Sequence, residues 1–284
     1  MQLTDKAYAK INISLDILAK MDNGYHSLKT IMQTVALFDD ITIVITRGNG
    51  FSINTDIPYI PDDDRNIAVK TAKAFYKHTG ITGYHTNIKI NKSIPICAGL
   101  GGGSADAACV LRILNVLHQT GLERKELEEI SATVGSDVPF CIDGGTKLSE
   151  GRGEILTDLP SMPHCYVVIC KPPFSFSTPE LFSLVDIKKI RIKPDTDGII
   201  NALAVRDLKN ITRRMYNVFE DIVPRGKIEI EAIKGTLLDN GALSAIMTGS
   251  GPSVYGLFDE KSKAQNAFAH LRSNYEECFI TETI

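Results

Sequence analysis

A run of glycines at residues 99–103 is the part of this sequence whose residue types most clearly suggest chemistry. Four of these five positions are glycine, and Ser104 follows directly. Glycine leaves backbone N–H groups uncovered, so such a loop can approach an anion closely. The alternative is a flexible connector. However, an amphipathic helix is predicted directly after the loop, and the N-terminus of a helix favours phosphate. We therefore expect this segment to bind the phosphates of a nucleotide.

Other phosphate-binding patterns fit the same segment less well. The Walker pattern ends in Gly-Lys-Ser/Thr, and no such triplet occurs in the sequence. The dinucleotide fingerprint requires glycine at its sixth position, where Ser104 stands, and an acidic residue at the end of a second strand. The acidic residue at the right distance, Glu123, falls in a predicted helix. A dinucleotide-dependent oxidoreductase that uses residues 99–104 as its fingerprint stays open as the alternative from another class.

Several elements are predicted around this loop in the first half of the chain. Alternating apolar and polar residues predict a strand at 6–19, with Lys10 and Asn12 on its polar face, and a β-rich stretch at 28–46. A helix is predicted at 66–78, ending at Gly80, and a strand at 85–90. The helix after the loop is expected to have Ser104 as its N-cap, with Asp106 favouring the positive end of its dipole.

The rest of the chain mixes helices and strands, so an α+β fold is predicted. A cluster of prolines at 160–173 favours a boundary between an N-terminal domain at 1–160, which contains the glycine-rich loop, and a C-terminal domain at 161–284. Further helices are expected at 123–133, 178–185, 197–206, 226–239 and 260–273, and strands at 138–142, 164–170, 243–247, 253–258 and 277–281.

Composition excludes several classes of protein. The 284 residues are 43% hydrophobic and 23% charged, with a formal net charge of −3 and no long block of like charge. A nucleic-acid partner is therefore not expected, since a basic face supplies most of such affinity. No apolar run is long enough for a membrane span, and the start lacks a signal-peptide pattern. Six scattered cysteines form no Cys-x-x-Cys pair, so we expect free thiols in a cytoplasmic protein.

The motif Pro-x-x-Ala-Gly-Leu-Gly-Gly-Gly-Ser-x-Asp-Ala-Ala, from Pro95 to Ala108, closely resembles the phosphate loop of the GHMP kinases, a superfamily of small-molecule kinases. Lys10-Ile-Asn12 resembles the N-terminal motif of that superfamily, and Thr248-Gly-Ser-Gly-Pro-Ser resembles its C-terminal glycine motif. One departure is Ala105, where many relatives have a second serine, so the hydroxyl contacts to phosphate stay open. The resemblance spans residues 8 to about 258.

Within the superfamily, the sequence most resembles the family of kinases that act on 4-diphosphocytidyl-2-C-methyl-D-erythritol. Gly24-Tyr-His26 and Gly135-Ser-Asp137-Val-Pro-Phe140 resemble motifs of that family. The resemblance implies an N-terminal domain like the second domain of ribosomal protein S5 and a ferredoxin-like C-terminal domain. It also implies ATP-dependent phosphorylation of the 2-hydroxyl of a substrate with a cytidine diphosphate group, in the non-mevalonate isoprenoid pathway. We expect Mg²⁺ with the ATP and a monomer or weak homodimer.

The resemblance also implies roles for individual residues. Asp137 is expected to accept the proton of the substrate hydroxyl, with Lys10 orienting it and offsetting charge. His26 is expected to hydrogen-bond the cytosine, and Tyr25 and Phe182 to stack on it. The residues expected to contact the rest of the acceptor are Asn12, Thr248, Gly249, Ser250 and Gly251. The residues expected to hold ATP are Pro95, Ala98, Gly99, Leu100, Gly101, Gly102, Gly103, Ser104 and Ala105.

Two alternatives stay open beside the oxidoreductase. The chain could be a GHMP kinase for another acceptor, such as homoserine or mevalonate, or a nucleotide-binding regulator without catalysis. An intact pair of Lys10 and Asp137 argues against the regulator. The magnesium ligands are not assigned.

Overall fold

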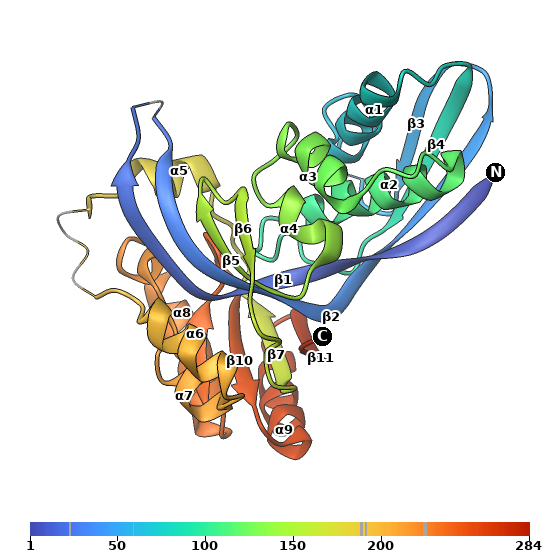
Figure 1. Cartoon of the computed structure of the whole chain (residues 1–284). Coiled ribbons are helices and arrows are strands. Elements are labelled where there is room, and N and C mark those ends of the chain that lie inside the picture. The colour runs from blue at the N-terminus through green and yellow to red at the C-terminus, as the bar shows by residue number, and fades with distance from the viewer. Residues whose placement is uncertain (23, 59, 188–189, 191, 224–225) are drawn as a thin grey trace. The chain divides into compact units, whose positions relative to one another are not determined.

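The computed structural model describes residues 1–284 except 23, 59, 188–189, 191 and 224–225 (Figure 1). The chain forms two compact units, each built from several segments. Unit 1 consists of residues 1–9, 38–96 and 101–144, and unit 2 of residues 10–37, 97–100 and 145–284. The long strands β1 (Gln2–Lys20) and β2 (His26–Arg47) each contribute to both units. The division at residues 160/161 by function stays a prediction.

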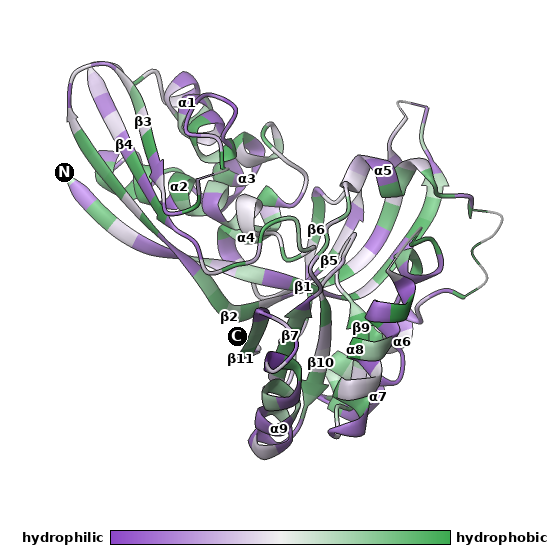
Figure 2. Ribbon diagram, turned by 180° about the vertical axis from the view of Figure 1, so that it is seen from behind, coloured by the Kyte–Doolittle hydropathy of each residue, from purple (hydrophilic) through white to green (hydrophobic). Residues whose placement is uncertain are grey.

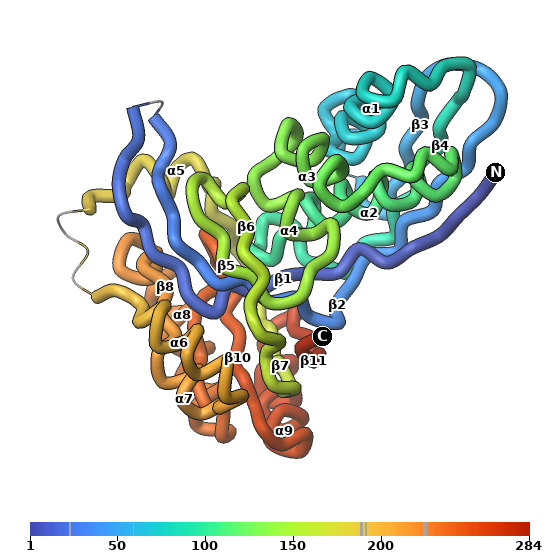
Figure 3. Tube along the Cα trace, viewed as in Figure 1, coloured from blue at the N-terminus to red at the C-terminus, as the bar shows by residue number. Residues whose placement is uncertain are grey.

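Unit 1 combines β-strands with a group of helices on one face (Figures 1 and 3). The C-terminal part of β2 pairs antiparallel with β4 (Tyr84–Asn91), and β4 pairs in parallel with β3 (Gly50–Thr55). The helices are α1 (Ile67–Thr79), α2 (Gly102–His118), α3 (Arg124–Ala132) and α4 (Val138–Asp143). Helix α2 packs against α1 and α4.

The ends of α1 follow from local chemistry and confirm the prediction for this segment. The Asn66 side chain accepts a hydrogen bond from the backbone N–H of Ala68, which caps the start of the helix. Gly80 ends the helix in the left-handed conformation, with φ of 69°. Glycine adopts this conformation without the steric cost that a Cβ atom adds.

Two predictions near the expected site were wrong. Helix α2 begins at Gly102, with Gly101 rather than Ser104 as its N-cap, because Gly101 adopts a left-handed conformation that other residues avoid. Residues 138–142, predicted as a strand, form helix α4. A short apolar run cannot be assigned to strand or helix from periodicity alone, and Pro139 is well suited to the first turn of a helix.

Unit 2 contains a second sheet, with strand order β11-β7-β10-β9 and antiparallel pairing throughout. Its strands are β7 (Tyr166–Lys171), β9 (Ser244–Met247), β10 (Val254–Phe258) and β11 (Glu277–Glu282). Helices α8 (Lys227–Asp239) and α9 (Lys261–Arg272) pack on this sheet. The strands are largely hydrophobic, and α9 is largely hydrophilic apart from the side chains that it buries (Figure 2). These elements lie close to their predicted positions.

The remaining elements of unit 2 surround its part of β1 and β2. Strand β5 (Thr146–Gly151) pairs with β2 and with β6 (Ile155–Asp158), and β8 (Tyr216–Asn217) pairs in parallel with β1. Leu15 and Ile17 of β1 belong to the same buried apolar cluster as Phe219 and residues of α8 and α9. The other helices are α5 (Thr178–Ser183), α6 (Thr196–Ala204), α7 (Leu208–Thr212) and the 3₁₀ turn η2 (Val218–Asp221).

The arrangement is the α+β fold that the sequence predicted. No helix in the described part of the chain is both long and apolar enough to cross a membrane. All six cysteines are free thiols, and only Cys97 is exposed.

Candidate active site

The start of α2 offers backbone donors at the glycine-rich segment. The first hydrogen bond of the helix runs from the backbone N–H of Ala105 to the carbonyl oxygen of Gly101, at 2.8 Å. The backbone N–H groups of Gly102, Gly103 and Ser104 therefore have no acceptor within the helix. Together with the helix dipole, such groups favour an anion such as phosphate.

The glycines of this segment serve different purposes. A Cβ atom on Gly99 would lie 2.1 Å from the carbonyl oxygen of Thr248, so only glycine fits against the 248–251 loop of unit 2. At Gly103 the nearest atom to such a Cβ would be 3.6 Å away, on Ile67. The first glycine is therefore required for packing within the protein, whereas the helical position at 103 has space for a side chain.

A hydrogen-bond network in unit 2 connects four of the predicted site residues. The Lys10 amino group donates to Asn12 Oδ1 at 2.7 Å, and the backbone N–H of Asn12 donates to Thr248 Oγ1 at 3.1 Å. The Thr248 hydroxyl also lies 3.3 Å from the carbonyl oxygen of Gly99. Thr30 and Tyr255 hold Asn12 from two further sides, through its amide Nδ2 and its carbonyl oxygen. Neither Thr30 nor Tyr255 lies in a motif, so the sequence analysis did not identify them.

The 248–251 loop is fixed from the opposite side by polar side chains. Asn217 Nδ2 donates to the carbonyl oxygens of Met247 and Gly249, at 2.7 and 2.8 Å. The Ser250 and Thr178 hydroxyls form a hydrogen bond of 2.9 Å. A Cβ atom on Gly251 would lie 2.3 Å from the sulfur of Met247, so this position requires glycine. The loop is therefore held in one conformation in which Thr248 contacts both Asn12 and Gly99.

The residues expected to bind a cytosine lie near the tip of the β1–β2 hairpin in unit 2. The rings of His26 and Phe182 stack with their centroids 5.3 Å apart and an interplanar angle of 24°. Burial, with a smaller contribution from Lys20, lowers the pKa of His26, so its imidazole is neutral at neutral pH and presents one donor and one acceptor. Tyr25 is 55% exposed, and the Arg152 guanidinium lies 5.4 Å from the centre of its ring.

Asp137 occupies the N-cap position of α4 in unit 1. Gly135 packs closely before it, since a Cβ atom there would lie 3.2 Å from the side chain of Val138. This carboxylate therefore lies at the positive end of a short helix dipole, which stabilises negative charge. Lys10 belongs to unit 2, so its predicted pairing with Asp137 stays a prediction.

A buried ion cluster beside α2 was missed by the sequence analysis. Lys92 contacts Asp39 and Asp106, so Asp106 is a buried hydrogen-bond partner of Lys92 rather than a residue placed to favour the helix dipole. The spacing of residues in the sequence could have identified this cluster. Asp106 shares one helix face with the buried residues Val110 and Ile113. An aspartate on an apolar face indicates a buried partner.

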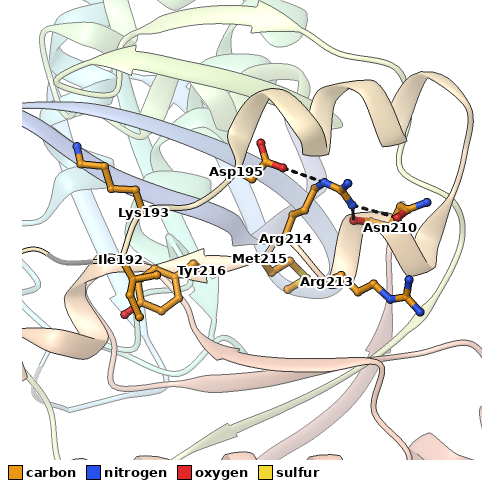
Figure 4. A pocket seen from close by; sticks show the side chains of 8 residues that line it. All are labelled: Ile192, Lys193, Asp195, Asn210, Arg213, Arg214, Met215 and Tyr216. Atoms are coloured by element: carbon orange, nitrogen blue, oxygen red, sulfur yellow. Dashed lines mark hydrogen bonds and ion pairs between the residues drawn. The ribbon is translucent and has the colours of Figure 1, made fainter.

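A surface hollow of about 600 Å³ in unit 2 does not include any predicted site residue. Figure 4 shows Arg214 hydrogen-bonded to Asp195 and Asn210, while Arg213 points away from Lys193. The positive groups therefore do not converge on one anion. The residues that line the hollow are Ile192, Lys193, Asp195, Asn210, Arg213, Arg214, Met215 and Tyr216.

Comparisons with known proteins agree with this geometry. Family models described as GHMP kinases N terminal domain and GHMP kinases C terminal match residues 66–145 and 199–277. The chain is 42% identical to a 4-diphosphocytidyl-2-C-methyl-D-erythritol kinase from Clostridium botulinum (strain Loch Maree / Type A3), over 99% of this chain and 100% of the relative. A relative of the same name from Clostridium kluyveri is also 42% identical, over 98% of this chain and 99% of its own length.

Solved structures give the same result for the fold. A crystal structure of 4-(cytidine 5'-diphospho)-2C-methyl-D-erythritol kinase matches with a TM-score of 0.83 and 28% identity, over 99% of both chains. A homoserine kinase from Cytophaga hutchinsonii matches with a TM-score of 0.78 over 100% of this chain and 94% of its own, but at 20% identity it supports the fold alone. These similarities confirm the predicted two-part α+β architecture.

Proposed function

The chain belongs to the 4-diphosphocytidyl-2-C-methyl-D-erythritol kinase family of the GHMP kinases, and on that premise we propose that it transfers the γ-phosphate of ATP to the 2-hydroxyl of 4-diphosphocytidyl-2-C-methyl-D-erythritol. The product enters the non-mevalonate route to isoprenoid precursors. As a member of this family the chain is a small-molecule kinase that uses ATP.

The observation that carries the proposal is the position of Thr248 between two segments with different expected roles. Its hydroxyl accepts a hydrogen bond from Asn12, expected to contact the acceptor, and lies against Gly99, in the segment expected to hold ATP. A shift of the segment at Asn12 or of the segment at Gly99 would therefore also move the other through Thr248. Phosphoryl transfer depends mainly on such positioning, because the protein performs little covalent chemistry.

We assign proton transfer to Asp137 and charge neutralisation to Lys10. A carboxylate can accept the proton of the attacking hydroxyl when it lies within hydrogen-bond reach, and a nearby ammonium group offsets the negative charge that spreads over the transferred group. The assignment requires that these two residues act on the same hydroxyl. The bond from the Lys10 amino group to Asn12 and the position of Asp137 at the start of α4 support it.

We assign recognition of the cytosine to His26, Tyr25 and Phe182. A base inserted between Phe182 and Tyr25 would replace the ring contact that Phe182 now makes with His26. The neutral imidazole of His26 can donate to, or accept from, the polar edge of cytosine. Asn12 and the 248–251 loop are assigned to the erythritol and its phosphates.

The nucleotide is assigned to the segment from Pro95 to Ala105, and Mg²⁺ is expected to accompany its phosphates. Among the described residues, no group of three or more His, Cys, Asp or Glu side chains could hold a metal ion. The described side chains thus do not fit a metal site built by the protein alone, and no step of the transfer is assigned to the ion.

An assay of ATP consumption against a panel of acceptors tests the function. We expect turnover with 4-diphosphocytidyl-2-C-methyl-D-erythritol and almost none with 2-C-methyl-D-erythritol 4-phosphate, which lacks the cytidine. Homoserine and mevalonate as acceptors test the alternative of another kinase of the superfamily. A measurement of NAD(P)H binding tests the alternative of an oxidoreductase. Equal turnover with and without the cytidine group, or turnover with homoserine or mevalonate alone, would contradict the proposal.

We also propose that the enzyme acts in the cytoplasm as a monomer or weak homodimer, without a nucleic-acid partner. The near-neutral charge balance and the small-molecule substrate support this. Sedimentation velocity at several protein concentrations tests the oligomeric state. A single species of dimeric mass at nanomolar concentration would contradict it.

A further inference from the structure

Three charged side chains are buried together beside the first turn of α2. The Lys92 amino group lies 2.5 Å from Asp39 Oδ2 and 2.8 Å from Asp106 Oδ2. The side chains of Lys92, Asp39 and Asp106 are 4%, 0% and 6% exposed. Two ionised carboxylates facing one ammonium group in a buried site would leave one negative charge uncompensated. The roles assigned above do not use this cluster.

The two aspartates are not equivalent. Asp39 receives a hydrogen bond from Lys92 on one oxygen and from the backbone N–H groups of Ser93 and Ile94, at 2.6 and 2.8 Å, on the other. Asp106 receives only the bond from Lys92, and its Oδ1 is buried without a hydrogen-bond partner among the described residues. Three donors stabilise an ionised Asp39, whereas an ionised Asp106 would keep one bare buried oxygen.

The cluster lies directly against the helix end that offers backbone donors. A Cβ atom on Gly102 would lie 3.4 Å from the Lys92 amino group and 3.0 Å from the side chain of Ile94. Gly102 is the first residue of α2, and Asp106 lies one turn further along the same helix. A change of charge at Asp106 therefore acts on the N–H groups of residues 102–104 at short range and through a medium of low dielectric.

We propose that Asp106 is a positioning residue that keeps its proton at neutral pH, so that Lys92 and Asp39 form a neutral ion pair beside the start of α2 and no net negative charge opposes the phosphates of ATP there. The inference rests on the proposed function, because it places ATP at this helix end. Loss of the proton is expected to weaken ATP binding, not to stop the transfer step.

The direction of titration agrees with this geometry. Burial raises the pKa of Asp106 to about 8; Lys92 opposes the rise and Asp39 adds to it. The carboxyl is thus neutral below about pH 8 and negative above it. Of the groups that face it, Lys92 has a raised pKa because its two carboxylates outweigh the effect of burial. Burial also raises the pKa of the Cys109 thiol, so both keep their protons to about pH 9.

Apart from Lys92 and Asp39, no charged side chain forms an ion pair with Asp106 in the described part of the chain. Beyond Cys109 on α2 lie Asp5 and Arg112, which form an ion pair of 3.0 Å with each other. Helices α1, α3 and α4, which also pack on α2, provide no ion pair to Asp106 among these residues. The charge of the cluster between pH 7 and 9 therefore depends on one proton.

The test compares the pH dependence of KM for ATP in the wild type and in Asp106→Asn, at saturating acceptor. We expect KM for ATP in the wild type to rise by about tenfold between pH 7 and 9, as one added charge predicts, with kcat nearly unchanged. Asp106→Asn should lack this rise. The matched control is Asp143→Asn, whose aspartate pairs with Arg124 at the surface of the same unit and should leave the rise intact. A flat wild-type profile, or the same rise in Asp106→Asn, would overturn the proposal.

A second measurement decides the matter if Asp106→Asn does not fold. Wild-type protein carrying ¹³C-labelled aspartate carboxyls should show one carboxyl signal that titrates near pH 8, far from the usual aspartate value of about 3.9. If every aspartate signal titrates below pH 6, the proposal is wrong. The two proposals fail separately: absence of kinase activity at every pH would contradict the function, whereas the titration reports the proton on Asp106 whether or not the substrate is correct.

Discussion

Unit 1 and unit 2 contribute different kinds of chemical group to the proposed reaction. Unit 1 provides the starts of two helices, α2 with its backbone donors and α4 with Asp137, together with the buried ion cluster at Lys92. Unit 2 provides hydrogen-bonding groups around Asn12, among them the Lys10 amino group, and the stacked rings of His26 and Phe182. Under the proposed function, unit 1 is assigned the start of α2 for the phosphates and Asp137 for the proton, whereas unit 2 is assigned most of the contacts to the acceptor.

Asp137→Asn should have the largest effect on activity and is the most direct test of the role of unit 1. Loss of a general base is expected to lower kcat by about 10²–10⁴-fold, with little change in KM for either substrate. Steady-state kinetics and a thermal melt measure the two properties. Asp143→Asn, at the other end of α4, is the control and should retain both activity and stability. Near-normal kcat in Asp137→Asn would remove the assigned base.

Gly99→Ala tests a residue that does not follow the division between the units. Gly99 lies in the segment expected to hold ATP, but it belongs to unit 2. The new Cβ would lie 2.1 Å from the Thr248 carbonyl oxygen, at a residue whose φ is +78°. Strain and overpacking together should lower the free energy of unfolding by about 2–4 kcal/mol. Urea denaturation measures this value. A change in KM for ATP with unchanged stability would show that the close contact with Thr248 is not required.

Phe182→Ala tests whether unit 2 recognises the base. Stacking of a base on an aromatic ring contributes about 1–3 kcal/mol, so KM for the acceptor should rise by about tenfold or more while KM for ATP stays the same. Phe268→Ala is the control, since Phe268 packs against the same apolar cluster from α9. Equal changes in the two variants would mean that lost packing, rather than lost stacking, explains the result.

Gly103→Ala should have the smallest effect on stability and activity. It tests whether the backbone donors at the start of α2 bind ATP. The nearest atom to the new Cβ would be 3.6 Å away, so the helix should gain about 0.5–1 kcal/mol of stability from the loss of a helical glycine. KM for ATP should rise a few-fold, because the methyl group covers the backbone donors that glycine leaves exposed. The control is Gly235→Ala in α8, where nothing lies within 4 Å and only stability should change.

Local patterns predicted much of the fold because they act over a few residues. The alternation in β1 and the left-handed Gly80 after α1 both depend on neighbours in sequence, and both were predicted correctly. The prediction of a strand at 138–142 was wrong because five consecutive apolar residues show neither a helical nor a strand period. Pro139 favours the start of a helix, but only where the fold provides a buried position for α4. The N-cap of α2 depended on the backbone conformation of Gly101.

Motifs identified candidate site residues but not what holds them in place. Lys10, Asn12 and Thr248 were singled out from their motifs, whereas the bond from Asn12 to Thr248 joins residues 236 positions apart. The same applies to Lys92 and Asp39, 53 positions apart, whose pairing with Asp106 has no local signature. Long-range polar contacts depend on the completed fold, and a single sequence does not reveal them.

The chain passes between the two units repeatedly, and this limits how the protein can be made and how it can change. The last segment of unit 1 ends at Gly144, so that unit is fully synthesised when only half of the chain has left the ribosome. Residues 10–37 and 97–100 can then complete their packing only after residues 145–284, the rest of unit 2, have been synthesised. One cut in the gene does not yield either unit alone, so a single recombination event between relatives cannot exchange unit 1 as one continuous segment.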